Sequence, residues 1–471
     1  MPLAKLITPK IINVLAGSRS WFTGLILVSF LPAFSQDNSP YTRYGLGDLV
    51  PSTNVNSRSM GGISAGYTDF LSINFNNPAS YSCFQTVREQ SSKKMQYGRA
   101  ILDVGVNIES RTLSEPNNIG KFTASNALFS HVQVGVPLRP NWGLSFGLRP
   151  VTRVSYKVVS RERLVDPNTG QSIDTAQTLN EGNGGAYLAS LGTGYKFNLG
   201  TYTALSLGVN GGYLFGNKDI SSRRSIFNDS LEYNSGNFET KTSYGNLFAN
   251  AGLQFFTKVG KDLYLTVGAY GNWKQELNAR QDIIRETYFF DENAGNTRLD
   301  SVSVKTDVKG KITYPSNYTG GFVLEKEVNL SENKGGWLVG VDFSQNKWSE
   351  YRSYGQADPT VQDKWELRVG GQLRPVPKAN YFSNVAYRAG FFIGEDYVEV
   401  QNKLPLLGFT LGAGLPIRNY NRQTIGQATI INLGLEFIKR GNNDNLLKEN
   451  LFRLSVGFSL SDFWFVRRKY E

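Results

Sequence analysis

The chain has 471 residues, 40% of them hydrophobic and 13% aromatic, with a formal net charge of +11. That length is large for a single soluble domain and ordinary for one large β-barrel. A helical membrane protein needs several apolar runs of about 18 or more residues, and the sequence contains none. The single cysteine excludes a disulfide within the chain, and with only one histidine beside it, zinc sites built from these residues are excluded.

The basic residues are scattered along the chain rather than clustered, which argues against a nucleic-acid partner. A polar lumen and rim tolerate charge spread in this way. Contact with the anionic head groups of outer-membrane lipids is the other interpretation. Abundant glycine and aromatic residues fit a barrel that turns often and carries aromatic girdles.

The beginning of the chain has the pattern of a secretory signal peptide. Three basic residues and no acidic residue precede an apolar run, Leu25–Leu31. Ala33 and Ser35 supply small side chains at the positions that a signal peptidase requires. We therefore predict that residues 1–35 are a signal peptide cleaved after Ser35, and the lack of a nearby cysteine argues against a lipoprotein anchor.

The main structural signal is alternation with a period of two, which is typical of strands because successive side chains point to opposite faces. It is clearest near the C-terminus, where small or polar residues alternate with Phe452, Leu454, Val456, Phe458 and Leu460. Similar segments predict about 14 strands, near 97–111, 122–136, 142–159, 183–198, 201–216, 238–257, 262–281, 316–328, 335–348, 362–374, 384–397, 404–418, 426–439 and 449–463.

Two features favour a membrane barrel over a soluble β-sandwich. The strands recur to the C-terminus at a spacing longer than sandwich strands usually have. The second face of the strands also carries charge, which a polar lumen accommodates; the charged residues are Asp103, Glu109, Asp342, Glu366, Arg368, Arg388 and Glu436. Since lipid leaves no partner for a free backbone group, the sheet must close into a barrel.

Short and long connections alternate between the predicted strands. The turn Leu138–Asn141 is short, as periplasmic turns are. Longer polar stretches at 160–182, 218–237 and 282–314 are predicted to be surface loops. The last of them contains the alternating run Ser301–Lys305, which predicts an extra hairpin within it.

The segment before the first strand does not follow the strand pattern. Residues 36–95 are rich in Gly, Ser and Asn and contain no clear long strand. We predict that this segment is a hatch, a plug folded inside a transmembrane barrel of residues 96–471. Proline fixes φ, and asparagine side chains can pair backbone groups in a non-helical plug; the hatch motif comprises Gly61, Gly62, Asn76, Asn77, Pro78 and Ala79.

With this motif the chain resembles the long-chain fatty acid transporter (FadL) family of outer-membrane proteins. Members of that family carry an Asn-Pro-Ala hatch ahead of a 14-stranded barrel. Tyr314–Gly321 resembles the proline-containing start of a mid-barrel strand in the family. The opening Ser39–Asp48 and the ending Trp464–Tyr470 resemble the Bacteroidetes branch.

The resemblance implies passive uptake of hydrophobic small molecules, such as long-chain fatty acids, through a plugged barrel in the outer membrane. It implies no enzyme activity, cofactor or metal. The ligand-binding residues stay unassigned, because no basic residue aligns with the family's site for the ligand carboxylate. One alternative is open: related PorV-like barrels act as partners or shuttles in type IX protein secretion, where long surface loops would bind secretion-system proteins or clients.

Two motifs that suggest catalysis have simpler explanations. Gly143–Gly147 matches the G-x-S-x-G nucleophile elbow around Ser145, but the elbow needs a helix after the strand, and here the strand pattern continues. His131 shares the alternation of Phe129 and Gln133, so we predict a polar residue that faces the lumen. A phospholipase is disfavoured because His131 would be its sole candidate base.

Two further residue types have structural interpretations. Cys83 lies at the end of the hatch segment and is predicted to be a small buried filler. Tryptophans near strand ends are predicted to anchor the barrel at the membrane interface, with a role in a ligand path as the alternative; these are Trp142, Trp273, Trp348 and Trp464.

Overall fold

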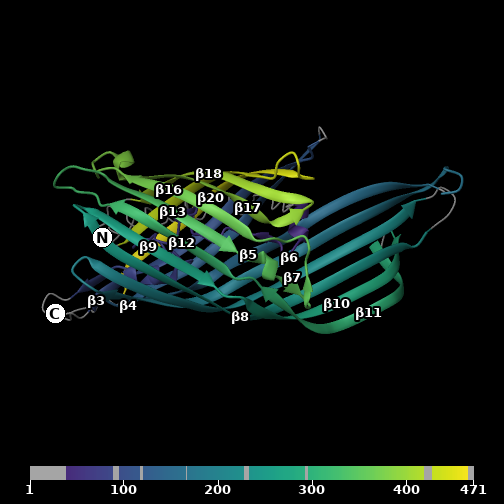
Figure 1. Cartoon of the computed structure of the whole chain (residues 1–471), viewed down its shortest axis with the longest axis horizontal. Coiled ribbons are helices and arrows are strands. Elements are labelled where there is room, and N and C mark those ends of the chain that lie inside the picture. Colours follow the sequence, from purple (N-terminus) through teal and green to yellow (C-terminus); the bar gives the residue numbers. More distant parts are fainter. Residues whose placement is uncertain are drawn as a thin grey trace, which may run out of the picture.

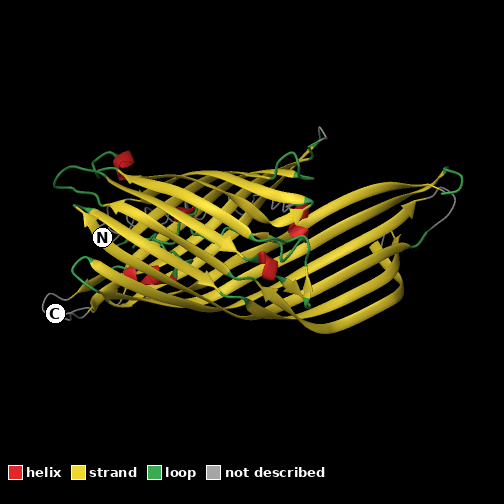
Figure 2. Ribbon diagram, viewed as in Figure 1, coloured by secondary structure: helices red, strands yellow, loops and turns green. Residues whose placement is uncertain are grey.

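The computed structural model describes residues 39–88, 95–116, 120–165, 167–227, 233–291, 295–417 and 427–464. The predicted signal peptide lies outside the described residues. Within those ranges, no helix has both the length and the apolar character needed to cross a membrane. The chain is almost entirely β-structure, as Figure 2 shows.

The strands form one closed antiparallel barrel (Figure 1). Its wall consists of β3 (Met95–Ser114), β4 (Lys121–Arg139), β5 (Trp142–Val165), β6 (Ser172–Asn198), β7 (Thr203–Phe227), β8 (Ser235–Gly260), β9 (Leu263–Asn272), β10 (Gln275–Asp291), β11 (Gly295–Tyr314), β12 (Asn317–Lys326), β13 (Gly336–Asn346), β16 (Lys364–Arg374), β17 (Ala386–Val400), β18 (Asn402–Ile417), β19 (Ala428–Arg440) and β20 (Lys448–Trp464). β20 pairs with β3 along its whole length, which closes the ring. β10 continues β9 and β12 continues β11, so the predicted 14-stranded barrel is confirmed.

The two faces of the wall follow the alternation of the sequence. On β20, Phe452 and Phe458 are exposed on the outside, whereas Arg453 and Ser455 are buried on the inside. The acidic residues predicted for the lumen are all buried there, and so is Arg388. An apolar exterior and a paired backbone are what lipid demands, so these strands span a membrane.

The prediction of surface loops at 160–182, 218–237 and 282–314 is wrong, because most of these residues continue the strands. β5–β6, β7–β8 and β10–β11 form long hairpins that project beyond the rest of the barrel, on the right of Figure 1. The residues are polar because the sheet there has left the membrane, not because it has ended. The hairpin expected around Ser301–Lys305 is confirmed, since this run lies in β11, paired with β10. We call this side of the barrel the extended end.

Residues 39–88 lie inside the barrel, so the plug is confirmed. They form only short elements: η1 (Pro40–Arg43), β1 (Asp48–Leu49), α2 (Val55–Arg58), η2 (Pro78–Cys83) and β2 (Thr86–Arg88). Most of these residues are buried, and β2 pairs with the beginning of β3. The remaining short elements connect wall strands: η3 (Trp348–Glu350), β14 (Arg352–Ser353), β15 (Gln356–Ala357) and η4 (Tyr381–Asn384).

The largest apolar core lies at the extended end, beneath the first described residues. We call Ser39–Leu49 the cap, because Tyr41 and Leu46 pack into this core with side chains from the wall. Trp348 is 2% exposed and stacks on Tyr397, with ring centroids 4.3 Å apart. The prediction that Trp348 anchors the barrel at the membrane interface is therefore wrong, because η3 turns this ring inward.

Candidate functional site

The Asn-Pro-Ala motif joins the hatch to the wall. Asn77 caps η2, because its Oδ1 accepts a hydrogen bond from the backbone N–H of Ala79 at 3.2 Å. Its Nδ2 donates to the carbonyl oxygens of Ala65 in the hatch, at 2.7 Å, and of Leu253 in β8, at 3.1 Å. Asn77 is fully buried, and Pro78 follows at the first position of the helix, where its missing N–H costs nothing.

Glycines on the inner wall make room for this motif. A Cβ on Gly252 would lie 2.1 Å from Oδ1 of Asn77, and one on Gly208 would lie 2.3 Å from the carbonyl carbon of Pro78. Gly194 on the neighbouring strand would meet the Pro78 oxygen at 2.4 Å. The hatch backbone thus rests directly on three adjacent strands, β6, β7 and β8, and any larger residue would push it away.

The two glycines of the motif make a sharp turn against the opposite wall. Gly61 and Gly62 have φ values of +67° and +87°, which only glycine adopts without strain. The N–H of Gly61 donates to Oγ1 of Thr410 at 2.8 Å. Asn76 completes the motif, since the Asn250 amide donates to its carbonyl oxygen at 3.2 Å. The fold therefore distributes the motif residues between two docking points on the wall.

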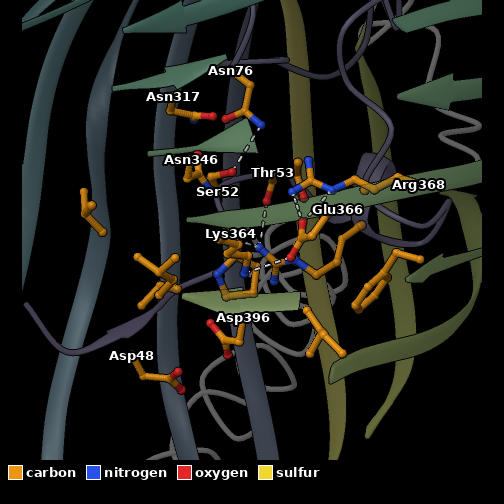
Figure 3. Close-up of a pocket in the computed structure, with 18 of the residues that line it drawn as sticks. Asp48, Ser52, Thr53, Asn76, Asn317, Asn346, Lys364, Glu366, Arg368 and Asp396 are labelled. Carbon is orange, nitrogen blue, oxygen red and sulfur yellow. Dashed lines mark hydrogen bonds and ion pairs between the residues drawn. The ribbon is translucent and has the colours of Figure 1, made fainter. Parts of the chain in front are cut away.

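Between the cap and the hatch lies a cavity of about 230 Å³. Its floor includes Gly61, Gly62 and Asn76 of the hatch motif, and its roof includes Asp48 and Leu49 of the cap. The walls differ in character. One side carries charged side chains, several of which Figure 3 shows pointing into the space, and the other carries aromatic residues next to uncharged amides.

On the charged side, three carboxylates surround two guanidinium groups. Arg440 lies 2.5 Å from Asp396, 3.1 Å from Asp48 and 3.2 Å from Glu449. Arg111 lies 2.8 Å from Asp48 and 3.0 Å from Glu449. Burial by itself raises the pKa of the Asp48 carboxyl, but attraction to Arg111 and Arg440 outweighs it and holds this pKa well below its usual range. The cluster joins the cap to four wall strands.

A second cluster joins the hatch helix to the wall. Arg453 contacts Glu109 at 2.5 Å and Glu436 at 3.1 Å. Arg58, the last residue of α2, lies 3.9 Å from Glu436 and donates to Oδ1 of Asn107 at 2.6 Å. Burial lowers the pKa of Arg58 to about 10, so its guanidinium remains charged at neutral pH.

A third cluster lies on a single strand, β16. Lys364 is 2.8 Å from Glu366, and Arg368 donates to the same carboxylate through Nε at 2.9 Å. Figure 3 shows both cations pointing toward Glu366 from the same strand. The three side chains share one face because they are two residues apart along a strand.

Arg149 is the cation in the cavity that these clusters leave out. It lies on β5, with its guanidinium carbon 5.6 Å from the centroid of the Phe75 ring. Among the described residues no hydrogen bond or ion pair is found for its guanidinium. The aromatic side of the cavity, with Phe248, Tyr270 and Tyr314, belongs to the same lining. This side therefore combines an apolar surface with an uncompensated positive charge.

The wall beside this aromatic side is interrupted. Regular pairing between β8 and β10 ends at Gly245 opposite Asn278, and pairing between β8 and β9 begins only at Ala251 opposite Gly271. The Gln275 side chain fills part of the interruption, because it accepts from the N–H of Ala249 at 2.8 Å and donates to its carbonyl at 3.0 Å.

The interruption has a local cause in the sequence. Two residues, Trp273 and Lys274, separate β9 from β10, and Pro315 with Ser316 separates β11 from β12. Proline cannot donate to a ladder, and the breaks in the two neighbouring strands face each other, between the pairs Gln275–Tyr314 and Asn272–Asn317. On the outside, Leu247 is 75% exposed at the interruption. The cavity is thus separated from the outside of the barrel here by a wall with few backbone hydrogen bonds.

The cap closes the cavity at the extended end through several hydrogen bonds. Lys218 of β7 donates from Nζ to the carbonyl oxygens of Arg43, at 2.7 Å, and Gly45, at 2.6 Å. The Tyr397 hydroxyl donates to the carbonyl of Gly47 at 2.5 Å. These bonds hold the cap over the cavity at this end.

The residues considered for catalysis lie apart from this cavity. His131 is buried in the lumen, as predicted, with Nε2 3.4 Å from Asp103. Phe129, however, is exposed on the outside, because a bulge at Ser130 shifts the alternation of β4. Ser145 faces inward in the middle of β5, and no helix follows it. No group of His, Cys, Asp and Glu that could hold a metal occurs in the described ranges.

The other residues singled out from the sequence have mixed outcomes. Trp273 and Trp464 are exposed at the outside of the wall, as interfacial anchors would be, and Trp142 is half-buried. Cys83 is also half-buried, so the prediction of a small buried filler is wrong. It ends η2, where its thiol lies 3.7 Å from the Ser82 hydroxyl.

Sequence reasoning did not find Arg149, Arg440 or the two clusters around Arg111 and Arg453. The inward alternation on β19 and β20 marks Arg440 and Arg453 as lumen residues, but their partners come from strands far away in the sequence. Arg58 lies in the hatch next to the recognised Gly61–Gly62 pair, yet a single arginine in a polar segment carries no signal of its own.

Comparison with known proteins gives one family and several similar structures. The BamG family matches residues 19–471. No curated protein matches. Among solved structures, the Pseudomonas putida toluene transporter TodX is 14% identical with a TM-score of 0.48, and the match covers 86% of this chain and 97% of that one.

Two further structures are similar to the same degree. A Pseudomonas aeruginosa FadL homologue is 13% identical with a TM-score of 0.49, and covers 89% of this chain and 100% of its own. The CymD monoaromatic hydrocarbon channel is 12% identical with a TM-score of 0.47, covering 90% and 99%. The family match spans the hatch and the whole barrel, so this outer-membrane β-barrel chain belongs to the BamG family.

Proposed function

We propose that the protein is a passive outer-membrane channel for the uptake of hydrophobic small molecules that carry a polar head. The observation that carries this proposal is the position of the cavity, whose aromatic side reaches the interruption between β8 and β10. An apolar chain gains about 25 cal/mol for each Å² that it removes from water, so such a wall suffices to attract it. No ATP or redox chemistry is required.

The uncompensated positive charge of Arg149 on the aromatic side of the cavity makes a purely apolar ligand a poor fit. The guanidinium of Arg149 is half-buried and has no partner among the described residues, and a carboxylate would compensate it with charge-assisted hydrogen bonds. We therefore propose long-chain fatty acids or similar anionic amphiphiles as ligands, with the head at Arg149 and the chain along Phe248, Tyr270 and Tyr314. This proposal offers a ligand site where the sequence left the binding residues open.

The geometry supports a route with two gates. A ligand would pass the cap at the extended end, rest in the cavity, and leave sideways between β8 and β10 or past the hatch. Gln275 closes the sideways exit with side-chain rather than ladder hydrogen bonds. Such bonds can break without unzipping the sheet, which makes this part of the wall the easiest to open.

The test measures binding and uptake of oleate. Arg149→Met should raise the Kd of the purified protein for oleate about tenfold or more, because a hydrogen bond to a charged group is lost. Binding of the uncharged decanol should stay unchanged. Arg139→Met, at the exposed end of β4, is the matched control.

Uptake of labelled oleate should fall in a deletion strain and recover with the wild-type gene but not with the Arg149→Met variant. Unchanged oleate uptake after deletion would exclude the fatty acid version of the proposal. If the Arg149→Met variant loses oleate and decanol binding equally, the carboxylate head of oleate does not bind at Arg149.

A partner or shuttle role in type IX secretion is the second candidate. Instead of the expected surface loops, the extended end offers a sheet that could bind a client, and this specific feature favours the candidate. Purification from gently solubilised membranes tests it. Stoichiometric translocon subunits would support the secretion role, and their absence would leave uptake as the function.

A further inference from the structure

The wall of the barrel is split between β4 and β5 at the extended end. The ladder between these strands ends at Val132 opposite Leu148. Beyond this pair, β4 is paired only with β3, and β5 is paired with β6 and briefly with β1 of the cap. In Figure 1 the tips of the β3–β4 and β5–β6 hairpins lie far apart. We call this split the seam.

Along the seam the outer face of β4 changes from apolar to polar. Phe129 and Ala127 are followed toward the tip by Ser125 and Thr123, which hydrogen bond to the polar side chains Ser110 and Thr112 of β3. Hydrocarbon does not tolerate a free strand edge, but the polar region beyond it does. The edge of β4 is therefore available to molecules at the cell surface rather than to lipid chains.

Proteins normally protect a free edge with charges, prolines or bulges. The other free edge of the extension, on β11, is protected in this way, because three register shifts interrupt its pairing with β10. On β4, by contrast, Phe122–Phe129 contains no charge, proline or glycine. Its register with β3 is unbroken from Lys121 to Phe129. This edge is regular and unprotected.

Two observations indicate what fits the seam. First, the chain itself already adds a strand there, since Asp48 and Leu49 of β1 pair with Arg153 and Thr152 of β5. Second, Oδ1 of Asn126 is buried on the inner side of β4 without a hydrogen-bond partner in the part of the chain that the structure describes. The backbone edge of β4 and the Asn126 side chain thus lack the partners that a further strand would supply.

The charge of the β5 side chains beside the seam indicates which kind of added strand would bind there. The outer face of β5 beyond the membrane carries Lys157, Arg161 and Arg163. Lys157 pairs with Glu181 at 3.2 Å, and the Arg161 Nε donates to the Gln177 amide oxygen at 3.0 Å. No carboxylate partner occurs for either arginine among the described residues. Opposite charges on adjacent strands stabilise pairing, so an added strand with acidic outward side chains is favoured.

We propose that the seam is a docking site for an extended acidic segment of a partner polypeptide, which adds as a β-strand to the edge of β4 beside β5. Backbone hydrogen bonds supply most of the affinity in this mode, and alternate side chains supply the specificity. The inference is independent of the uptake proposal, because it uses neither the cavity nor the interruption at β8. It predicts a stable partner bound at the surface end of the barrel.

Hydrogen–deuterium exchange tests whether the edge is covered in the native membrane. The purified protein reconstituted in liposomes is compared with the same protein in native outer-membrane vesicles. Amides in Phe122–Phe129 should exchange about tenfold more slowly in the native vesicles. Amides of β11 between Thr297 and Lys311 should exchange equally in both. Equal exchange of the β4 edge in the two samples would overturn the proposal.

Photo-crosslinking from Ser125 identifies the occupant. A benzoylphenylalanine probe at Ser125 should give adducts with an acidic peptide, and moving the probe to Thr123 should shift the adduct by two residues. The matched probe at Ser301, on the bulged edge of β11, should give none. Arg163→Glu should lower the crosslinking yield about fivefold, and Arg163→Lys should preserve it. Adducts with lipid alone would overturn the proposal. So would a crosslinking yield that is the same in the Arg163→Glu variant as in the wild type.

Discussion

Replacing Asn77 by alanine should release the hatch without unfolding the barrel. The side chain makes one hydrogen bond to the N–H of Ala79 and two to the carbonyls of Ala65 and Leu253. At about 1 kcal/mol for each bond, their loss destabilises the docked hatch by about 3 kcal/mol. Since 1.36 kcal/mol corresponds to a factor of ten, the open hatch should become roughly a hundredfold more populated.

The barrel itself should be unaffected, because no ladder hydrogen bond involves this side chain. The assay is hydrogen–deuterium exchange of the purified variant in detergent. Exchange of hatch amides between Gly61 and Phe84 should accelerate, whereas amides of β17 and β20 should stay protected. Ion conductance in planar bilayers should show more frequent open events.

Asn380 provides a matched control, because it also caps a 3₁₀ helix and accepts a hydrogen bond from Phe382 at 3.2 Å, but on the exposed surface. Asn380→Ala should leave hatch exchange unchanged. If Asn77→Ala exchanges no faster than Asn380→Ala, the asparagine does not hold the hatch, and the docking argument is refuted. If the whole barrel loses protection, hatch and wall unfold together and the two-part description is wrong.

Three further predictions follow from the same structure. Gly252→Ala should displace the hatch, because the new Cβ would lie 2.1 Å from Oδ1 of Asn77. A Cβ at Gly211 would have no atom within 4 Å, so Gly211→Ala should leave the hatch in place. Exchange of hatch amides distinguishes the two variants. Arg440→Met should lower stability by about 3–5 kcal/mol, because it leaves buried carboxylates such as Asp48 less compensated. Acidification should restore part of the lost stability, because it protonates these carboxylates. Unfolding of the variant followed by its gel shift at several pH values would show this. Mass spectrometry of the mature protein should find Gln36 at its N-terminus; an uncleaved chain would contradict the signal peptide.

Much of the barrel was predictable because alternation is local. Each strand carries its own pattern of outward and inward residues, so strand number, the lumen face and the charged residues in it followed from neighbours two positions apart. The extent of the strands was underestimated for a related reason. Beyond the membrane both faces become polar, as in the hairpin around Ser301, and the periodicity of hydrophobicity that marks a strand disappears although its backbone pairing continues.

The hatch was recognisable as a segment but not as a structure. Gly61, Gly62 and the Asn-Pro-Ala run stand out in the sequence because glycine and proline restrict the backbone in characteristic ways. Their docking partners do not stand out. Gly252 and Thr410 are ordinary residues of alternating strands, and what they do depends on which part of the hatch the closed barrel presses against them.

By itself, then, the sequence determined the membrane barrel, the plug, and the residues that face the lumen, since these depend on short-range patterns and on what lipid tolerates. Only the tertiary structure decided the cavity, the ion pairs across it and the seam. Arg111 and Arg440 meet the same carboxylates although they are far apart in the chain, and Phe129 faces outward only because one bulge at Ser130 shifts the strand. Such features arise from closing the sheet, which brings strands of unrelated sequence position to one place.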